Sequence, residues 1–525
     1  MELTGANFIG YELSKLGKHT FSAYNPSIDE ALPVIFTEAT MEEIHLAIEK
    51  AEDAFQVYSQ KSDKKRAEFL DAIADQIMAL GDTLIQRCMA ETALPEARLR
   101  GERGRTVNQL KLFADLLREG SWVNAKIDQA EPDRQPAPKP DIRQMQRPLG
   151  PVGIFGASNF PLAFSVAGGD TASALAAGCT IIVKAHPAHP GTSELVAKAI
   201  LKAAKATEMP DGVFSLVQGP SIEVGMAIVR HPLIQAIGFT GSFRGGKSIF
   251  DAAVRRPVPI PVYAEMGSIN PVFILPEALA HRGETIAKGL IASLTLGVGQ
   301  FCTNPGVFIG QESEDMNHFL QHCSNLVSAC DAGIMLTKNI STAYKENRQK
   351  ALKTQSVELV AEGPFNSHPS TGQVSVLKTT VQNWLKEPGL SEEIFGPTSI
   401  GLVARDKEDL LALARNLEGH LTATIHGTEA DLKNHQDLLK ILERKVGRLL
   451  INGFPTGVEV CHSMIHGGPF PATTDVRTTS VGTDAIYRFT RPVCYQNFPA
   501  YLLPDALKDD NPLQIWRVID GERSR

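Results

Sequence analysis

Residues 180–217, with the sequence TIIVKAHPAHPGTSELVAKAILKAAKATEMPDGVFSLV, contain one complete β-α-β unit. Residues 180–184 are β-branched or apolar up to a final lysine, as in a strand buried on both faces. Residues 192–206 have the apolar spacing of a helix, and residues 213–217 form the next strand. A helix between two such strands brings the chain back parallel to the first strand, so this unit predicts a parallel sheet.

The same alternation continues on both sides of this unit. The expected elements are a strand at 152–155, a helix at 162–177 ended by Gly178, a helix at 222–230, a strand at 234–239 and a helix at 243–254. This order predicts an α/β fold with helices on both faces of the sheet. Ligands of such folds bind at the carboxyl ends of the strands.

The G-x-G-x-x-G dinucleotide motif is absent. In its place, residues 239–242 (Phe-Thr-Gly-Ser) end a strand and begin a helix, whose free N–H groups would suit a phosphate. A plain strand–helix turn is the alternative interpretation.

Bulk composition limits the function classes. The chain has 525 residues, 43% hydrophobic and 21% charged, which predicts a globular protein of two or three domains. A net charge of −7 argues against nucleic-acid binding, and no apolar run is long enough to span a membrane. Seven cysteines without C-x-x-C spacing argue against a metal site or disulfide framework. With no signal-peptide pattern at the start, we expect a cytoplasmic protein.

Other segments have clear local patterns. Thr40 and Glu43 have capping-box spacing at the start of a helix, and further helices are expected over 63–79 and 96–117. Residues 128–148 begin with a proline-rich excursion and end with strand-like alternation at 142–147. Residues 489–496 alternate in the same way and could pair with that strand, which would form a small β oligomerisation arm.

Residues 299–306 (Gly-Gln-Phe-Cys-Thr-Asn-Pro-Gly) lie between an expected helix at 284–294 and an expected strand at 307–309. Cys302 is therefore on a bend, where its thiol can project and its own N–H can point at a ligand. A thiolate is a strong nucleophile, but a thiol with a pKa of ~8.5 is mostly protonated near neutrality and needs activation. A small buried apolar residue is the alternative role for this cysteine.

The Cys302 segment resembles the nucleophile segment of the aldehyde dehydrogenase superfamily. Further motifs follow in that family's order over about 20–500. Asn159, in Ser-Asn-Phe-Pro, resembles the asparagine whose amide helps to form the oxyanion hole. Glu265, in Glu-x-Gly-Ser-x-Asn-Pro, resembles the general base, and its apolar neighbours predict a raised pKa.

The resemblance also implies cofactor-binding residues for NAD(P). Lys184 resembles the lysine that contacts the adenine ribose, and Gly241 and Ser242 resemble the pair near the pyrophosphate. Glu393 and Phe395, in Glu-Ile-Phe-Gly-Pro, resemble the residues that hold the nicotinamide ribose and pack beside the ring.

The resemblance implies a domain organisation as well. We expect a Rossmann-type cofactor-binding domain, an α/β catalytic domain, and a small β oligomerisation arm with a C-terminal tail. The cofactor-binding domain is expected at 1–127 and 149–257, and the catalytic domain at 258–487. The arm and tail are expected at 128–148 and 488–525. The boundary at 257 follows from the stiff proline-rich crossing at 257–261.

Three departures from the commoner family pattern are informative. Pro187 stands where many NAD-preferring members have a glutamate that binds the ribose hydroxyls, so we expect NADP, with NAD also possible. Residues 463–471 (SMIHGGPFP) replace the usual Pro-Phe-Gly-Gly loop, and Ala157-Ser158 replace the usual Pro-Trp. These variants resemble the 2-oxoglutarate semialdehyde (2,5-dioxopentanoate) dehydrogenase branch.

The expected function is therefore NAD(P)-dependent oxidation of an aldehyde, 2,5-dioxopentanoate to 2-oxoglutarate, through a thiohemiacetal and a thioester on Cys302. One alternative is an NADP-dependent medium- or long-chain fatty aldehyde dehydrogenase. Another, of a different class, is a catalytically silent structural or binding protein on this fold. The expected partners are a small aldehyde and further copies of the chain, as a homodimer or homotetramer.

Overall fold

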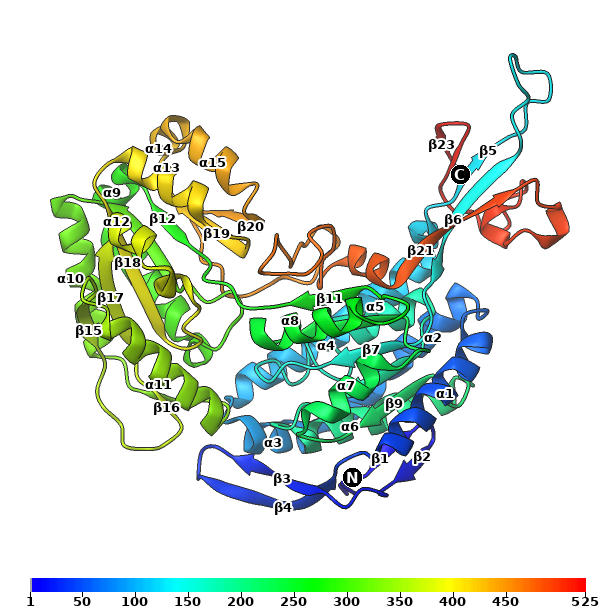
Figure 1. Cartoon of the computed structure of the whole chain (residues 1–525), viewed down its shortest axis with the longest axis horizontal. Helices are drawn as coiled ribbons and strands as arrows, with labels where there is room; N and C mark the ends of the chain where they lie inside the picture. Colours follow the sequence, from blue (N-terminus) through cyan, green and yellow to red (C-terminus); the bar gives the residue numbers. More distant parts are fainter. Residues whose placement is uncertain (1) are drawn as a thin grey trace.

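The chain forms two seven-stranded sheets and a projecting five-stranded sheet in a computed structural model that describes residues 2–525 (Figure 1). The first sheet has the order β11-β10-β7-β8-β9-β1-β2. Its strands are β1 Asn7–Ile9, β2 Glu12–Ser14, β7 Val152–Phe155, β8 Ile181–Lys184, β9 Phe214–Val217, β10 Ala236–Thr240 and β11 Val262–Glu265. Strands β7 to β11 run parallel, which confirms the parallel sheet predicted from residues 180–217.

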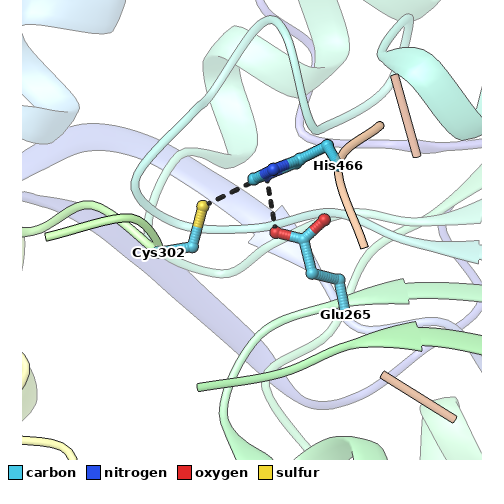
Figure 2. A group of neighbouring side chains, drawn as sticks. All are labelled: Glu265, Cys302 and His466. Carbon is cyan, nitrogen blue, oxygen red and sulfur yellow. Dashed lines mark hydrogen bonds and ion pairs between the residues drawn. The ribbon is translucent and has the colours of Figure 1, made fainter. Parts of the chain in front are cut away.

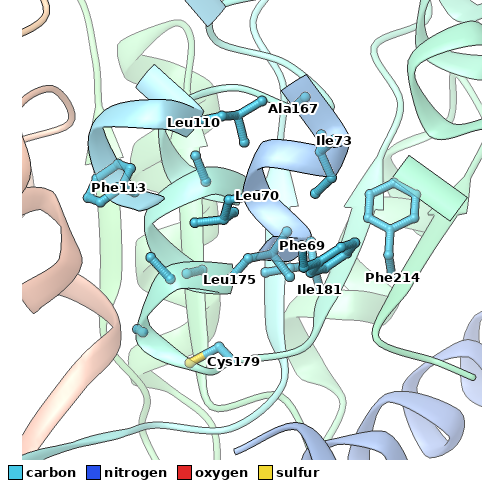
Figure 3. Packing of buried hydrophobic residues seen from close by; sticks show 14 of the residues in the cluster. Phe69, Leu70, Ile73, Leu110, Phe113, Ala167, Leu175, Cys179, Ile181 and Phe214 are labelled. Carbon is cyan, nitrogen blue, oxygen red and sulfur yellow. The ribbon is translucent and has the colours of Figure 1, made fainter. Parts of the chain in front are cut away.

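Helices cover both faces of this sheet. They are α1 Met41–Tyr58, α2 Asp63–Ala79, α3 Gly81–Thr92, α4 Glu96–Glu119, α5 Gly169–Ala177, α6 Pro190–Ala206, α7 Ile222–Arg230 and α8 Phe243–Val254. Ile181 packs with Phe69, Leu175 and Phe214 on one face (Figure 3). Its neighbour Ile182 packs on the other face, among residues of α1, α7 and α8. Successive side chains of a strand point to opposite faces, so both faces of β8 must be apolar.

The second sheet has the order β15-β17-β18-β13-β12-β19-β20, and only β15 is antiparallel to its neighbour. Its strands are β12 Val272–Ile274, β13 Val307–Gln311, β15 Glu358–Glu362, β17 Ser375–Thr380, β18 Thr398–Ala404, β19 His420–His426 and β20 Val446–Ile451. Its helices are α9 Pro276–Thr295, α10 Glu314–Ser328, α11 Lys338–Lys353, α12 Val381–Lys386, α13 Lys407–Asn416, α14 Glu429–Asn434 and α15 Gln436–Leu442. Separate apolar clusters cover its two faces.

The third sheet, of order β21-β6-β5-β22-β23, extends away from both larger sheets at the upper right of Figure 1. Strand β6 (Ile142–Pro148) pairs antiparallel with β21 (Thr490–Gln496), so the predicted pairing of these distant segments is confirmed. The other strands are β5 Lys126–Asp128, β22 Arg517–Ile519 and β23 Glu522–Ser524. Two small ladders complete the structure: β3 Thr20–Asn25 with β4 Glu30–Thr37, and β14 Gly333–Ile334 with β16 Thr371–Gly372.

Two predictions of local structure need adjustment. The helix expected over 162–177 begins only at Gly169, because the preceding residues form tight turns. Gly168 is extended, with a φ of −73° and a ψ of −171°, so the helix cannot continue back through it. Strand β11 also pairs within the first sheet, although it lies beyond the predicted boundary at 257. The predicted domain limits otherwise remain untested.

Among residues 2–525, no helix is both long and apolar enough to cross a bilayer.

A buried ion pair joins the first sheet's helices to the segment that follows the second sheet. Nη1 of Arg488, in the 3₁₀ helix η4 (Thr483–Phe489), donates to Oδ1 of Asp170 in α5 at 2.9 Å. The Arg488 side chain is 1% exposed. Burial raises the pKa of Asp170, and the Arg488 charge opposes that rise. The pair therefore fixes the path of the chain just after residue 480.

Replacing Arg488 by Met should leave the Asp170 carboxylate buried and unpaired, which costs about 3–5 kcal/mol of unfolding free energy. Denaturant titration measures this loss. Arg477→Met is the matched control, because the ion pair of Arg477 with Asp475 is 84% exposed on the arginine side and should contribute little. Equal denaturation midpoints for the two variants would contradict the prediction.

Candidate active site

Cys302 lies on the bend predicted for it, between the short helix η2 (Leu296–Gly299) and β13. Gly299 has a φ of 66°, and a Cβ at that position would lie 2.3 Å from the backbone of Gly396. The approach to the cysteine therefore requires a glycine here. Asn270 fixes the other side, because its Nδ2 donates to the carbonyl oxygens of Cys302 (2.8 Å) and Asn304 (2.9 Å). The bend is thus fixed on one side by the close approach of Gly299 to Gly396 and on the other by the hydrogen bonds of Asn270.

Glu265 is the last residue of β11, and its side chain is 1% exposed. Its Oε2 accepts a hydrogen bond from Oγ of Ser480 at 2.7 Å. Its Oε1 lies 3.0 Å from Nε2 of His466 (Figure 2). That contact lacks the direction of a hydrogen bond, so Oε1 has no aligned donor among the residues that the structure describes. One oxygen is therefore held in place while the other stays free to accept a proton.

The thiol of Cys302 completes this group. Its Sγ forms a 3.4 Å hydrogen bond with Nε2 of His466, the same nitrogen that faces Glu265 (Figure 2). Each of the three residues has one atom that could bind a metal, and these three atoms lie within 4.8 Å of one another. Such a trio could also hold a soft metal ion. The prediction from sequence was that this protein has no metal site, and the same atoms are equally suited to moving a proton from a thiol.

Burial raises the pKa of the Cys302 thiol well above its usual value, and the neighbouring negative charge of Glu265 adds to this effect. Burial alone would also raise the pKa of Glu265, but His466 in its protonated form and the hydrogen bond from Ser480 hold it below its usual value. The raised pKa predicted for Glu265 is therefore wrong. The apolar neighbours seen in sequence are present, but two polar partners from a distant segment outweigh them. Glu265 is thus ionised near neutrality beside a protonated thiol.

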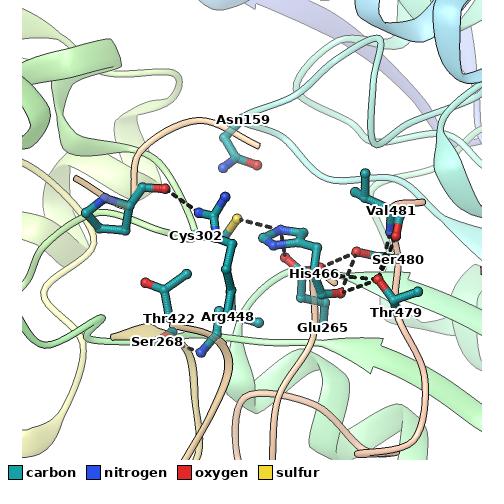
Figure 4. A network of polar contacts seen from close by, with 12 residues as sticks. Asn159, Glu265, Ser268, Cys302, Thr422, Arg448, His466, Thr479, Ser480 and Val481 are labelled. Atoms are coloured by element: carbon teal, nitrogen blue, oxygen red, sulfur yellow. Dashed lines mark hydrogen bonds and ion pairs between the residues drawn. The ribbon is translucent and has the colours of Figure 1, made fainter. Parts of the chain in front are cut away.

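Asn159 lies close to this group, next to the Cys302 segment (Figure 4). Its Nδ2 donates to the carbonyl oxygen of Gln300 at 3.0 Å, and the residue is 7% exposed. Because an amide nitrogen carries two hydrogens, the second N–H is available for an oxyanion. Nη2 of Arg98 donates to the Asn159 carbonyl at 2.7 Å and holds the backbone.

The predicted cofactor residues lie in two places. Lys184 ends β8, and Gly241 and Ser242 form the exposed turn between β10 and α8, all at the carboxyl edge of the first sheet. Burial lowers the pKa of Lys184 to about 8. Oγ of Ser242 accepts from the Gly245 N–H at 3.2 Å and caps the helix. This edge offers a cation and a helix N-terminus, which is the donor set that a pyrophosphate needs.

Glu393 and Phe395 line a cavity near the cysteine, together with Ser268, Gly299 and Asn304. Burial raises the pKa of Glu393 to about 7, although the Ser268 N–H donates to its Oε1 at 3.4 Å. A Cβ at Gly267 would lie 2.4 Å from the Glu393 carboxylate. The structure therefore places Glu393 and Phe395 at the cysteine loop, in a different part of the site from the three residues at the edge of the first sheet.

Two histidines, His186 and His189, follow Lys184. His189 is fully buried, with Nε2 2.9 Å from the Ala157 carbonyl and Nδ1 3.2 Å from Oγ of Ser193. It therefore positions the segment that leads to Asn159. His186 stacks on His189 with ring centroids 5.3 Å apart.

Sequence reasoning missed His466 and Ser480. Both lie in the irregular segment after β20, where the His466 N–H donates to Oγ1 of Thr479 (2.8 Å) and the Ser480 N–H donates to the His466 carbonyl (2.9 Å) (Figure 4). The signal was the unusual loop at 463–471, where a histidine precedes Gly-Gly-Pro. Its glycines allow close backbone contact, because a Cβ at Gly468 would lie 2.2 Å from the His420 carbonyl.

The pKa shifts predict how Cys302 reacts with iodoacetamide. Only the thiolate reacts, so its alkylation rate should keep rising with pH beyond the usual thiol pKa of ~8.5. Glu265→Gln removes the negative charge beside the sulfur, which should lower the pKa of Cys302 and move the curve to lower pH. Peptide mass spectrometry separates Cys302 from the exposed Cys494, the internal reference. Superimposed Cys302 curves for wild type and Glu265→Gln would contradict the assignment.

Comparison with known proteins gives a consistent result. Residues 14–480 match the model of the aldehyde dehydrogenase family. The chain is 51% identical over 523 residues to alpha-ketoglutaric semialdehyde dehydrogenase 2 of Azospirillum brasilense, covering 99% of this chain and 100% of that one. It is 46% identical to alpha-ketoglutaric semialdehyde dehydrogenase of Acinetobacter baylyi, covering 99% of each. Betaine aldehyde dehydrogenase from Staphylococcus aureus has the same fold, with a TM-score of 0.81 at 20% identity over 95% of this chain and 98% of that one. The chain therefore belongs to the aldehyde dehydrogenase family.

Proposed function

We propose that this protein oxidises 2-oxoglutarate semialdehyde to 2-oxoglutarate with NAD(P)+ and water. The observation that carries the proposal is the buried group of Cys302, His466 and Glu265, a nucleophile with two proton acceptors beside it. The two relatives that are 51% and 46% identical over their full length bear the name of this activity, which supports the choice of substrate.

Nucleophilic attack begins with loss of the thiol proton. Nε2 of His466 accepts it through the 3.4 Å hydrogen bond, and the carboxylate of Glu265, 3.0 Å away, stabilises the resulting imidazolium. The Cys302 thiolate then adds to the aldehyde carbon. The free N–H of the Asn159 side chain and the N–H of Cys302 bind the oxyanion of the thiohemiacetal.

The remaining steps release the acid. NAD(P)+, when bound, supplies the hydride acceptor that converts the thiohemiacetal to a thioester on Cys302. Water then attacks the thioester carbon, and Oε1 of Glu265, which has no aligned donor, takes the proton of that water. The C–S bond breaks, the carboxylic acid leaves, and the thiol is restored. Aldehyde, NAD(P)+ and water thus give acid, NAD(P)H and a proton.

We propose that five residues hold the cofactor: Lys184, Gly241, Ser242, Glu393 and Phe395. The first three suit the adenosine and pyrophosphate groups, and the last two suit the nicotinamide ribose and ring. The related Staphylococcus aureus structure is described as a complex with NAD+, which supports a nicotinamide cofactor. NADP+ is the proposed preference, because Pro187 places no carboxylate at the expected position of the 2′-phosphate.

We also propose the domain division expected from sequence, with its first boundary moved beyond β11, and an assembly into a homodimer or homotetramer through the projecting sheet. Exposed apolar side chains on the C-terminal segment support this proposal, since Tyr501 is 81%, Leu502 54% and Leu513 49% exposed. Sedimentation equilibrium tests it, and a monomer at micromolar concentration would contradict it.

The central test is NAD(P)H formation with 2-oxoglutarate semialdehyde, hexanal and succinic semialdehyde. Wild type should have its highest kcat/KM on the first, whereas preference for hexanal would favour a fatty aldehyde dehydrogenase. Cys302→Ala should lower turnover roughly 10⁴-fold or more, because the covalent nucleophile is lost. Cys494→Ala, a change at an exposed cysteine, is the control. Retention of more than about a tenth of the turnover, a loss of only ~1.4 kcal/mol, would rule out Cys302 as the nucleophile.

Cofactor preference has its own test. Pro187→Glu should lower kcat/KM for NADP+ far more than for NAD+, because the new carboxylate would repel the 2′-phosphate, whose charge is roughly −1.5 to −2. The measurement is kcat/KM for both cofactors, with Pro187→Gln as the uncharged control. A wild type that prefers NAD+ a hundredfold, or a cofactor ratio that the Glu substitution leaves unchanged, would overturn the preference for NADP+.

A further inference from the structure

One arginine near the catalytic group is held against aromatic rings. Arg105, in the middle of α4, places its guanidinium carbon 5.1 Å from the ring centroid of Phe164 and 5.5 Å from that of Phe160. Within residues 2–525 its side chain makes no hydrogen bond and no ion pair. Arg98, two turns earlier on the same helix, differs because it binds the Asn159 carbonyl and pairs with Glu102 at 3.6 Å.

Arg105 is connected to the reacting sulfur through Phe164 and His466. The ring of Phe164, which it contacts, is 5.8 Å from the ring of His466, and His466 is hydrogen-bonded to Cys302. Burial lowers the pKa of the Arg105 guanidinium, while the negative charges of Glu102 and Glu265, and that of Cys302 when ionised, oppose that shift. The half-buried guanidinium is therefore within electrostatic range of the thiol and of two carboxylates, yet it forms no ion pair with a described residue.

A second arginine lies near the same sulfur. Arg448, in β20, donates from Nη1 to the Gly457 carbonyl (3.0 Å) and from Nη2 to the Pro455 carbonyl (2.6 Å). Its Nε is buried and has no partner among the described residues. Figure 4 shows its side chain extending from β20 toward Cys302. Burial lowers the pKa of Arg448, Cys302 opposes this, and the positive charge of Arg105 lowers it further.

We propose that Arg105 and Arg448 form the subsite that binds the carboxylate at the far end of the substrate, a 2-oxo acid that carries an aldehyde. This inference rests on the proposed function. Two half-buried cations that form no ion pair with a described residue favour the entry of a carboxylate, and a guanidinium can bind both its oxygens. In the proposed substrate this carboxylate is only a few carbon–carbon bonds from the aldehyde carbon.

The walls between the arginines and the sulfur suit the middle of such a substrate. Phe160 and Phe301 contact each other edge-to-face at 5.2 Å, and Phe164 packs in the same apolar cluster. These rings can cover the methylene groups of the substrate, while the charged end reaches the guanidinium groups. An aldehyde without the carboxylate would meet the same walls but would leave both cations unpaired.

The test compares kcat/KM for 2-oxoglutarate semialdehyde with that for pentanal, an uncharged aldehyde with the same number of carbons. Arg105→Met should lower the ratio of the two values about 10- to 100-fold, the range expected for losing a charge-assisted hydrogen bond. Arg448→Met should lower it in the same direction. Arg100→Met is the matched control, because Arg100 lies on the same helix but pairs with Asp82 and Glu96 at the surface.

Because Arg448 also holds the loop at 455–457, the Arg105 variants decide the outcome. Arg105→Lys keeps the positive charge but loses the planar fork, so its ratio should fall by a smaller factor than that of Arg105→Met. Inhibition by 2-oxoglutarate gives a reading that does not depend on turnover, and its inhibition constant should rise at least about tenfold in Arg105→Met.

The outcomes separate the two proposals. Wild type that oxidises pentanal but not 2-oxoglutarate semialdehyde would contradict the proposed function. The second outcome concerns the carboxylate site alone. That site would be overturned if wild type oxidises the semialdehyde but the kcat/KM ratio and the inhibition constant of the Arg105 variants stay within about threefold of the wild-type values.

Discussion

The site depends on a carboxylate buried at the end of a strand. Glu265 is 1% exposed, and a buried charge is tolerated only where polar partners replace its hydration. Those partners are His466 and Ser480, which come from an irregular segment after the second sheet. Holding this one carboxylate therefore fixes a long loop against the first sheet, and the buried pair of Arg488 with Asp170 fixes the chain that follows it.

The carboxylate of Glu265 also makes ionisation of the nucleophile less favourable. A negative charge beside a buried sulfur favours the protonated thiol, so Cys302 cannot rest as a thiolate. His466 resolves this conflict, because its nitrogen contacts both the thiol sulfur and the carboxylate oxygen. A proton that moves from sulfur to nitrogen turns an unfavourable neighbour into a stabilising one, since Glu265 then faces an imidazolium. The thiol is thus unreactive at rest and activated only by a short proton transfer.

Local pattern explains how much could be predicted from sequence. The two-faced apolar strand at 181–184 and the paired segments at 142–148 and 490–496 carry their own periodicity, so their sheets were foreseen. The turns before Gly169 were missed because apolar residues there resemble a helix while the extended backbone of Gly168 interrupts one. The pKa of Glu265 was mispredicted for a related reason: its chain neighbours are apolar, but its partners lie about two hundred residues away, where spacing carries no information.

Charge pairing also bears on selectivity. The described part of the site places its buried carboxylate against a histidine, but holds Arg105 against aromatic rings without an ion pair. An aromatic face compensates a cation weakly compared with a carboxylate. A substrate that supplies the missing anion gains both the new contact and relief of the unpaired charge, whereas an uncharged aldehyde gains neither. A site whose cations are paired only by the substrate can discriminate strongly against uncharged aldehydes. This discrimination can exceed that from one missing methylene group, because an uncharged aldehyde leaves polar groups buried and unpaired.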